Sequence, residues 1–227
     1  MLRFTPILIA VLYGYVMYRF SVWRTTKELD ANSVDLADPA LLALSLDMAK
    51  ALDLPRIKVS IYKIAPVNGL AAADGRIFIT QGFLEKYKAD EVTAPELASV
   101  IAHELGHVAL GHSRRRMIDF SGQNAMRTAL AMILNRFIPF IGPFIANTLM
   151  SLLAAGLSRK DEYEADAYAS ALLVKAGIGV EPQISLFKKL DTLTGANGAA
   201  SPAWMMSHPK TAERIAAIEA NRDNWLG

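Results

Sequence analysis

The pattern of hydrophobic and polar residues divides the chain into an apolar N-terminal segment and a longer mixed region. Residues 4–23, FTPILIAVLYGYVMYRFSVW, are mostly apolar over a length that can cross a bilayer, and their tyrosines and tryptophan suit its interfaces. Bulky residues stand where a signal peptide needs small ones, so we expect an uncleaved transmembrane helix. More basic residues stand at its C-terminal end than before it, which favours a cytoplasmic location for the rest of the chain.

The pattern after this segment predicts helices and a small sheet. Residues 38–54 have helical spacing and begin with a capping Asp38 and Pro39. Residues 56–64, RIKVSIYKI, alternate as a strand, and residues 77–80, IFIT, form a second strand after a turn-rich stretch. The sequence therefore predicts an α+β fold that is mostly helical, with a small antiparallel sheet. It also predicts two parts, a membrane anchor with its linker at residues 1–30 and a domain at residues 31–227.

A second buried helix is predicted around residues 94–110, where apolar residues recur at helical spacing. Thr93 and Glu96 form the pattern of a capping box at its start. His103 and His107 are four residues apart, so both imidazoles project from one face at a separation that a single ion can bridge. His112 lies about 140° further around the helix, so we do not expect it to bind the same ion.

The segment HELGH at residues 103–107 matches the HExxH pattern of zinc enzymes, in which Glu104 would be the general base. The alternative is an amphipathic helix with two incidental histidines, but it leaves Glu104 at the edge of an apolar face without a role. The pattern needs a third ligand. Because the chain has no cysteine, that ligand must be a histidine or a carboxylate.

Residues 158–173 offer that carboxylate. Ser158 is the expected N-cap of a helix on which Glu162 and Asp166 share a face with apolar residues. An inward pair of carboxylates is costly unless a metal, a histidine or an arginine neutralises it. Glu162 is therefore the best ligand candidate, and Asp166 the best partner to orient a zinc-binding histidine. The alternative, acids that stabilise a helix dipole, explains Asp161 well and Asp166 poorly.

Two further features limit the possible partners. Residues 137–157 carry no charge and are long enough to span a membrane, but Pro139 and Pro143 interrupt them. We expect them to pack on the domain or to dip into the membrane, and the alternative is a second full span. The net charge of +2, from 24 basic and 22 acidic residues, is too balanced for a nucleic-acid-binding chain. The expected partners are a polypeptide and membrane lipid, with no nucleic acid.

Three motifs, HELGH, SRKDEYEAD at residues 158–166 and SHPKTAERI at residues 207–215, resemble in order and spacing those of membrane-associated gluzincin metallopeptidases. This is the family of HtpX and the CAAX prenyl protease, and the resemblance covers roughly residues 38–220. It implies a zincin-type domain with one Zn²⁺ per chain. The implied ligands are His103, His107 and Glu162, with Glu104 as base and Asp166 in support.

The resemblance also implies roles for residues outside the zinc ligands. His208 would stabilise the oxyanion, with Arg214 near it, and residues 67–80 are similar to the edge strand of the family's active site. The expected substrate-binding residues on that strand are Asn68, Gly69, Leu70 and Ala71. Members similar to HtpX carry two apolar segments before the zinc helix, and this chain has one.

These observations predict a zinc endopeptidase with a single-pass anchor in a bacterial inner membrane and a cytoplasmic catalytic domain. The resemblance implies misfolded or membrane-associated proteins as substrates, in protein quality control. One alternative is a catalytically silent, chaperone-like module of the same fold, but the intact Glu104 argues against it. Another is a CAAX-processing enzyme, whose multi-span chamber this short chain could not build alone.

Overall fold

The computed structural model describes residues 5–72, 74–112, 115, 130–131, 133–139, 141–193, 208 and 212–226. The chain folds as two units, of which the first takes in residues 1–30 and 112–160 and the second residues 31–111 and 161–227. The division predicted from the sequence, residues 1–30 and 31–227, stays a prediction.

A sheet of four short strands occupies the N-terminal part of the second unit. The strands are β1 (Ser33–Asp35), β2 (Val59–Tyr62), β3 (Gly69–Ala71) and β4 (Ile77–Thr80), in the order β1-β2-β4-β3. β1 pairs antiparallel with β2 and β3 antiparallel with β4, whereas β2 and β4 are parallel. The sheet is therefore mixed, and the prediction of an antiparallel sheet is wrong at its centre. After β2, the chain first forms β3 at the edge of the sheet. It then returns as β4, which lies between β2 and β3.

Among the described residues, this unit also contains five whole helices and the C-terminal part of a sixth. They are α2 (Pro39–Ala51), α3 (Gln81–Lys88), α4 (Ala94–Ala109), α7 (Glu181–Leu193) and α9 (Ala212–Leu226), with the end of α6 (Gly142–Lys175). The predicted start of α2 is confirmed, because the Asp38 side chain accepts hydrogen bonds from the backbone N–H groups of Ala40 and Leu41. The predicted capping box of α4 is also present. Thr93 N–H donates to Glu96 at 2.8 Å, and Glu96 N–H donates to Thr93 Oγ1 at 3.3 Å.

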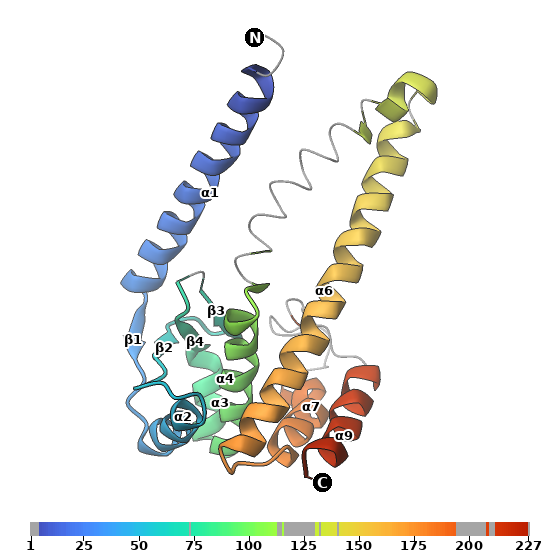
Figure 1. The fold of residues 1–227 in the computed structure, drawn as a ribbon. Helices are drawn as coiled ribbons and strands as arrows, with labels where there is room; N and C mark the ends of the chain where they lie inside the picture. The colour runs from blue at the N-terminus through green and yellow to red at the C-terminus, as the bar shows by residue number, and fades with distance from the viewer. Residues whose placement is uncertain are drawn as a thin grey trace. The chain divides into compact units, whose positions relative to one another are not determined.

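The helix α4 lies at the centre of the unit, with the sheet, α2 and α3 on one side and α7 on the other (Figure 1). Its side chains Leu97 and Ile101 belong to the same hydrophobic core as Ile61 and Ile79 of the sheet and Leu186 of α7. Every residue of α4 from Glu96 to His107 is buried. The polar side chains on this stretch must therefore find their partners inside the protein.

The helix α6 is longer than the sequence pattern indicates. It runs without a break over 34 residues, so the prediction that a helix begins at a capping Ser158 is wrong. No proline follows Pro143 until the helix has ended, and nothing in that stretch forces the backbone out of the helical conformation. The apolar residues from Gly142 onward and the acidic residues of the third-ligand segment thus lie on one helix.

The first unit contains α1 (Thr5–Ala31) and the N-terminal part of α6. Large apolar side chains on α1, among them Leu12, Tyr15 and Trp23, are each more than half exposed. Among the residues that the structure describes, no helix has both the length and the apolar character needed to cross a membrane. The transmembrane helix predicted at residues 4–23 is therefore not supported by the structure. The helix continues through the polar segment TTKELDA, and its apolar part includes Arg19 and three tyrosines.

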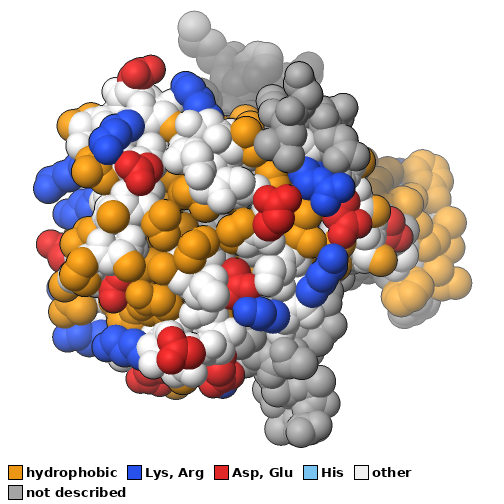
Figure 2. All heavy atoms as spheres, turned by 90° about the horizontal axis from the view of Figure 1, so that it is seen from below, with side chains coloured by type: hydrophobic (Ala, Val, Ile, Leu, Met, Phe, Trp, Pro, Cys, Tyr) orange, Lys and Arg blue, Asp and Glu red, His pale blue; other side chains and the backbone are white. Residues whose placement is uncertain are grey.

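The surface of the second unit carries apolar side chains as well. Leu42 and Leu46 of α2 are each nearly half exposed, and they line a hollow together with Arg56 and Lys58. Figure 2, which views the chain from below, shows hydrophobic side chains gathered among lysine, arginine and acidic side chains. Both signs of charge therefore border the apolar patch on this face.

Candidate metal centre

Four buried side chains from three elements of the second unit converge on one point. His103 and His107 come from α4, Glu162 from α6 and His208 from the segment before α9. One nitrogen or oxygen atom of each lies within 4.8 Å of the corresponding atoms of the other three. None of the four residues is more than 5% exposed. The structure thus brings together the three residues predicted as ligands and adds His208.

The distances within this group show which atoms face the centre. Nε2 of His107 lies 3.1 Å from Nε2 of His103. The two oxygens of Glu162 lie 3.3 Å from Nε2 of His103 and 3.4 Å from Nε2 of His107. Nδ1 of His208 lies 2.8 Å from Oε2 of Glu162 and 3.3 Å from Nε2 of His103. The donor atoms therefore point toward one another rather than toward solvent.

A close approach between α4 and α6 makes this convergence possible. Gly106 lies one residue before His107, and a Cβ atom there would lie 3.0 Å from both Cα and the carbonyl oxygen of Ala165. A side chain larger than hydrogen would push the two helices apart. Gly106 therefore lets the helix with the histidines pack directly against the helix with Glu162.

Glu104 lies in the same buried region without being one of the four converging residues. It is 1% exposed, and its Oε1 atom lies 3.4 Å from Nε2 of His208. Apart from this contact, Oε1 has no hydrogen-bond partner among the described residues. A buried carboxylate oxygen with unused acceptor capacity can take a hydrogen bond from a water molecule or a substrate group.

Asp166 and Arg214 form a second layer behind the histidines. Oδ1 of Asp166 lies 2.9 Å from Nδ1 of His103. The Arg214 guanidinium donates from Nε and Nη2 to the two oxygens of Asp166, at 2.7 and 2.9 Å. Its Nη1 atom lies 3.3 Å from Oε2 of Glu162. Arg214 is thus a buried cation that faces both carboxylates, and Asp166 holds the nitrogen of His103 that faces away from the centre.

The charges of the site shift the pKa values of its members in opposite directions. Burial alone would lower the pKa of His103, but the carboxylates of Asp166 and Glu162 outweigh it and raise the pKa to about 9. Burial is the main cause that lowers the pKa of His107 to about 3. Burial would raise the pKa of Glu162, but His103, His107 and His208 hold it far below its usual range. The carboxylate of Glu162 therefore stays ionised.

The chemistry of these donors fits a zinc ion. Imidazole nitrogens and a carboxylate oxygen are the usual ligands of Zn²⁺ in enzymes without cysteine ligands. Asp166 on Nδ1 of His103 leaves Nε2 to face the centre, which is the arrangement that orients zinc-binding histidines. His112 is not among the four converging residues, and its predicted lack of a role in metal binding stays a prediction.

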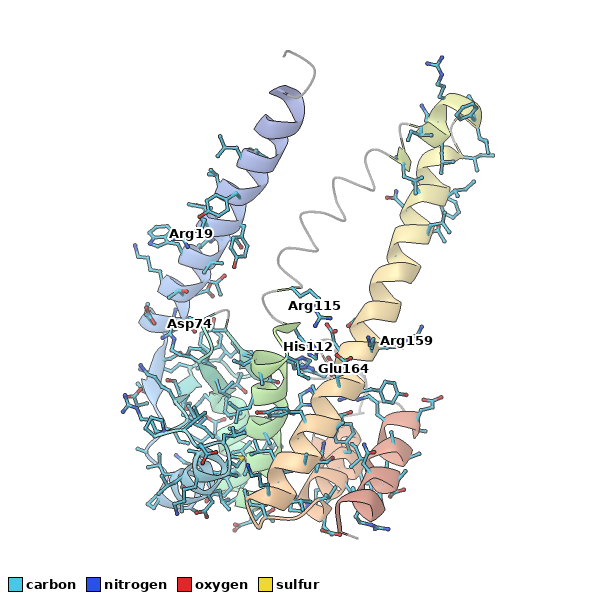
Figure 3. The ribbon with its side chains drawn as sticks, in the orientation of Figure 1. Arg19, Asp74, His112, Arg115, Arg159 and Glu164 are labelled. Atoms are coloured by element: carbon cyan, nitrogen blue, oxygen red, sulfur yellow. The ribbon has the colours of Figure 1, made fainter. Side chains whose placement is uncertain are left out.

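The expected substrate-binding residues lie at the edge of the sheet. Residues 69–71 form β3, which in the described part of the chain pairs with β4 alone and so occupies one end of the sheet. Asn68 precedes this strand, and its N–H group donates to Thr80 Oγ1 at 2.9 Å. The β3–β4 turn contains Asp74, which binds Arg76 at 2.7 Å (Figure 3). The structure thus provides an edge strand, and its role in substrate binding stays a prediction.

Three buried residues that support Asp166 and Arg214 were not predicted from the sequence. They are Ser170 on α6 and Gln183 and Phe187 on α7. The available signal was weak, because Gln183 is one of several polar residues in α7 and the sequence does not distinguish Phe187 from an ordinary core residue.

Comparisons with known proteins agree with the geometry. Residues 35–222 match the sequence model of peptidase family M48. Metalloprotease LoiP of Escherichia coli strain K12 is 32% identical, over 71% of this chain and 61% of its own length. Metalloprotease YcaL of the same strain is 29% identical over the same two shares. A protease HtpX homolog of Bordetella avium strain 197N is 28% identical, over 96% of this chain and 83% of its own length.

The match to LoiP and YcaL extends over 61% of the length of each of these relatives. The match to the family covers most of this chain, from β1 to α9, and includes every residue of the metal centre. The resemblance to HtpX-type metallopeptidases read from three short motifs is thereby confirmed at the level of the family. The chain belongs to peptidase family M48.

Proposed function

We propose that the chain is a zinc-dependent endopeptidase that hydrolyses peptide bonds in polypeptides. The observation that carries the proposal is the presence of Glu104 beside the four converging side chains. A structural metal site needs only ligands, whereas a hydrolytic site also needs a base that does not bind the metal. Glu104 is buried, it stands next to a ligand in the helix, and its Oε1 atom has acceptor capacity to spare.

His103, His107 and Glu162 would hold the ion. When bound, Zn²⁺ supplies Lewis acidity toward the peptide carbonyl and brings the pKa of a water molecule near 7. Glu104 would take a proton from the attacking water and pass it to the leaving amine, as a general base and then a general acid. Burial excludes bulk water from this carboxylate, so it acts on the water at the reacting carbonyl.

His208 would stabilise the oxyanion of the tetrahedral intermediate. Its Nδ1 atom is 2.8 Å from Glu162, and its Nε2 atom is 3.4 Å from Glu104. The carboxylate of Glu162 accepts from Nδ1, so Nε2 can donate to an oxyanion when the ring is an imidazolium. The same position, within 4.8 Å of the other ligand atoms, also suits a fourth metal ligand. The zinc content of a variant without His208 distinguishes these two roles, because only the loss of a metal ligand would lower it.

The substrate would bind as an added strand on the free edge of β3. An extended peptide that pairs with Gly69, Leu70 and Ala71 gains backbone hydrogen bonds that do not depend on its sequence. Such binding suits an enzyme that acts on unfolded segments, so we propose misfolded or membrane-associated proteins as substrates, in protein quality control. Asn68 and Ala72 hydrogen-bond to β4 and to the residue before it, so the strand alternation turns the backbone groups of Gly69 and Ala71 toward the free edge. Ala71→Pro removes an N–H group from that edge and is expected to raise KM more than it lowers kcat.

We also propose that α1 attaches the chain to a bacterial inner membrane as a single-pass anchor, with the catalytic domain in the cytoplasm. The support is the exposed Leu, Val, Phe, Tyr and Trp side chains on α1, with Arg19 within its apolar part (Figure 3) and Arg24 and Lys27 after that part. Fractionation of cells that express the full chain tests this proposal. Release of the protein from membranes by high salt or by alkaline carbonate would contradict a spanning anchor.

A casein-cleavage assay on the detergent-purified chain tests the enzymatic proposal. We expect cleavage by the zinc-loaded protein, loss of cleavage with a chelator, and recovery when zinc is restored. The Glu104→Gln variant, prepared in the same way, controls for contaminating proteases. Zinc-loaded protein that binds unfolded casein without cutting it would instead favour the catalytically silent, chaperone-like alternative.

A further inference from the structure

Two side chains of α7, Gln183 and Phe187, stand one turn apart and reach the surroundings of Asp166 from different directions. Gln183 Nε2 donates a hydrogen bond to the backbone oxygen of Asp166 at 3.3 Å. Ser170 Oγ lies 2.9 Å from the same backbone oxygen and 2.8 Å from Oε1 of Gln183. Gln183 and Ser170 are no more than 1% exposed. The turn of α6 that carries Asp166 is therefore tied to α7 through buried polar groups.

Phe187 contacts the cation that binds the side chain of Asp166. The central guanidinium carbon of Arg214 lies 4.9 Å from the centre of the Phe187 ring. Phe187 is 3% exposed and Arg214 is 2% exposed, so water competes little with this contact. The aromatic face restricts where the planar guanidinium can lie. In the observed position, Nε and Nη2 each bind one oxygen of Asp166.

Ordinary core packing accounts for only part of these contacts. Phe187 belongs to the hydrophobic core, and an aliphatic side chain could fill the same volume. A buried glutamine is costly unless its amide is hydrogen-bonded, and Gln183 bonds to the residue that orients His103. Both residues therefore act on Asp166. Gln183 contacts its backbone directly, and Phe187 contacts Arg214, which binds its carboxylate.

We propose that Gln183 and Phe187 are positioning residues of the metal centre, which fix Asp166 from its backbone and from its carboxylate and thereby orient the imidazole of His103. The inference rests on the proposed function only in taking the centre to bind a metal. It assigns to α7, which supplies no ligand, the task of setting the geometry of a ligand on α4.

The test compares Phe187→Leu with Phe83→Leu. Phe83 of α3 is a fully buried phenylalanine of the same hydrophobic core, so both variants lose the same atoms from similar surroundings. We expect both to lower the melting temperature. Only Phe187→Leu should also weaken zinc affinity, by about tenfold, as changes behind a metal ligand typically do. Only Phe187→Leu should change the visible absorption spectrum of the cobalt-substituted full chain.

Gln183→Leu provides a second variant of nearly the same size. It removes the hydrogen bond to Asp166 and is expected to change the cobalt spectrum in the same way. The proposal is overturned if both α7 variants keep the zinc affinity and the cobalt spectrum of the unmodified chain, or if Phe83→Leu alters them equally. Failure of the proposed function gives a different result, namely a normal cobalt spectrum in a chain that cleaves no polypeptide.

Discussion

Nε2 of His107 lies 3.1 Å from Nε2 of His103 in the buried interior of α4 and its neighbours. Two imidazole nitrogens at this distance cannot both be protonated without strong repulsion, and Glu162 lies within 3.4 Å of each. A single metal cation bound by both nitrogens and by Glu162 would remove this repulsion, which is why the arrangement suits a metal site.

Glu104→Gln should keep one zinc ion per chain and lose proteolysis. The amide has nearly the size of the carboxylate but cannot take a proton, and removal of a general base typically lowers the rate by about 100-fold or more. Metal analysis and a protease assay on the same preparation measure both effects. Substantial turnover by this variant would show that another group is the base.

The two inward carboxylates of α6 should respond differently to substitution. Glu162→Ala removes a proposed ligand and should lose most of the bound zinc. Asp166→Ala should keep the ligands and weaken zinc affinity by about 10- to 100-fold. It also leaves Arg214 buried without its main partner, which should lower the free energy of unfolding by about 3 kcal/mol. Chelator competition and denaturant unfolding separate the two effects, and the reverse order of zinc loss would exchange the roles.

His208→Ala distinguishes stabilisation of the oxyanion from metal binding. If His208 acts on the oxyanion, zinc content should stay at one per chain while kcat falls by about 100-fold with little change in KM. His112→Ala, which alters a histidine outside the converging group, is the matched control and should change neither quantity. Loss of zinc from the His208 variant would instead make it a fourth ligand.

Gly106→Ala should separate α4 from α6. The added Cβ atom would lie 3.0 Å from backbone atoms of Ala165, which cannot move aside as a flexible side chain could. Overpacking of this kind costs about 1–3 kcal/mol of the free energy of unfolding and should also reduce zinc affinity. Thermal unfolding with and without zinc measures the two effects. A variant with unchanged melting temperature would show that the two helices can separate at no cost.

Glu96 should make the stability of the chain depend on pH. Burial alone would raise its pKa, but hydrogen bonds from Lys189, Ser185 and Thr93 outweigh it and lower the pKa below the ordinary value of 4.5. Because the folded-state pKa is the lower one, its contribution is fully present above pH 4.5 and is lost as the pH falls through the folded-state value.

Glu96→Gln should therefore lower the free energy of unfolding by about 2 kcal/mol at pH 7. The difference from the unmodified chain should shrink in acid. Urea unfolding at several pH values measures it. A constant difference down to pH 3 would mean that the carboxylate charge contributes nothing, and that the loss comes from packing alone.

The sequence alone determined those features of the site that depend on residues close together in one helix. The spacing of His103 and His107 fixes their common face, because an α-helix repeats every 3.6 residues. The capping box of Thr93 and Glu96 is local for the same reason, since its two hydrogen bonds join residues three apart. The absence of cysteine narrowed the third ligand to a histidine or a carboxylate, and inward acids on one helical face pointed to Glu162.

Only the tertiary structure decided how distant segments meet. The place of β4 between β2 and β3 makes the sheet mixed, and strand order depends on which edges are covered and not on the alternation within a strand. The bidentate contact of Arg214 with Asp166, and the support of both by Gln183 and Phe187, join residues up to 48 positions apart. No local period encodes such contacts, because they arise when apolar faces of different helices pack into one core and buried polar groups must then find one another.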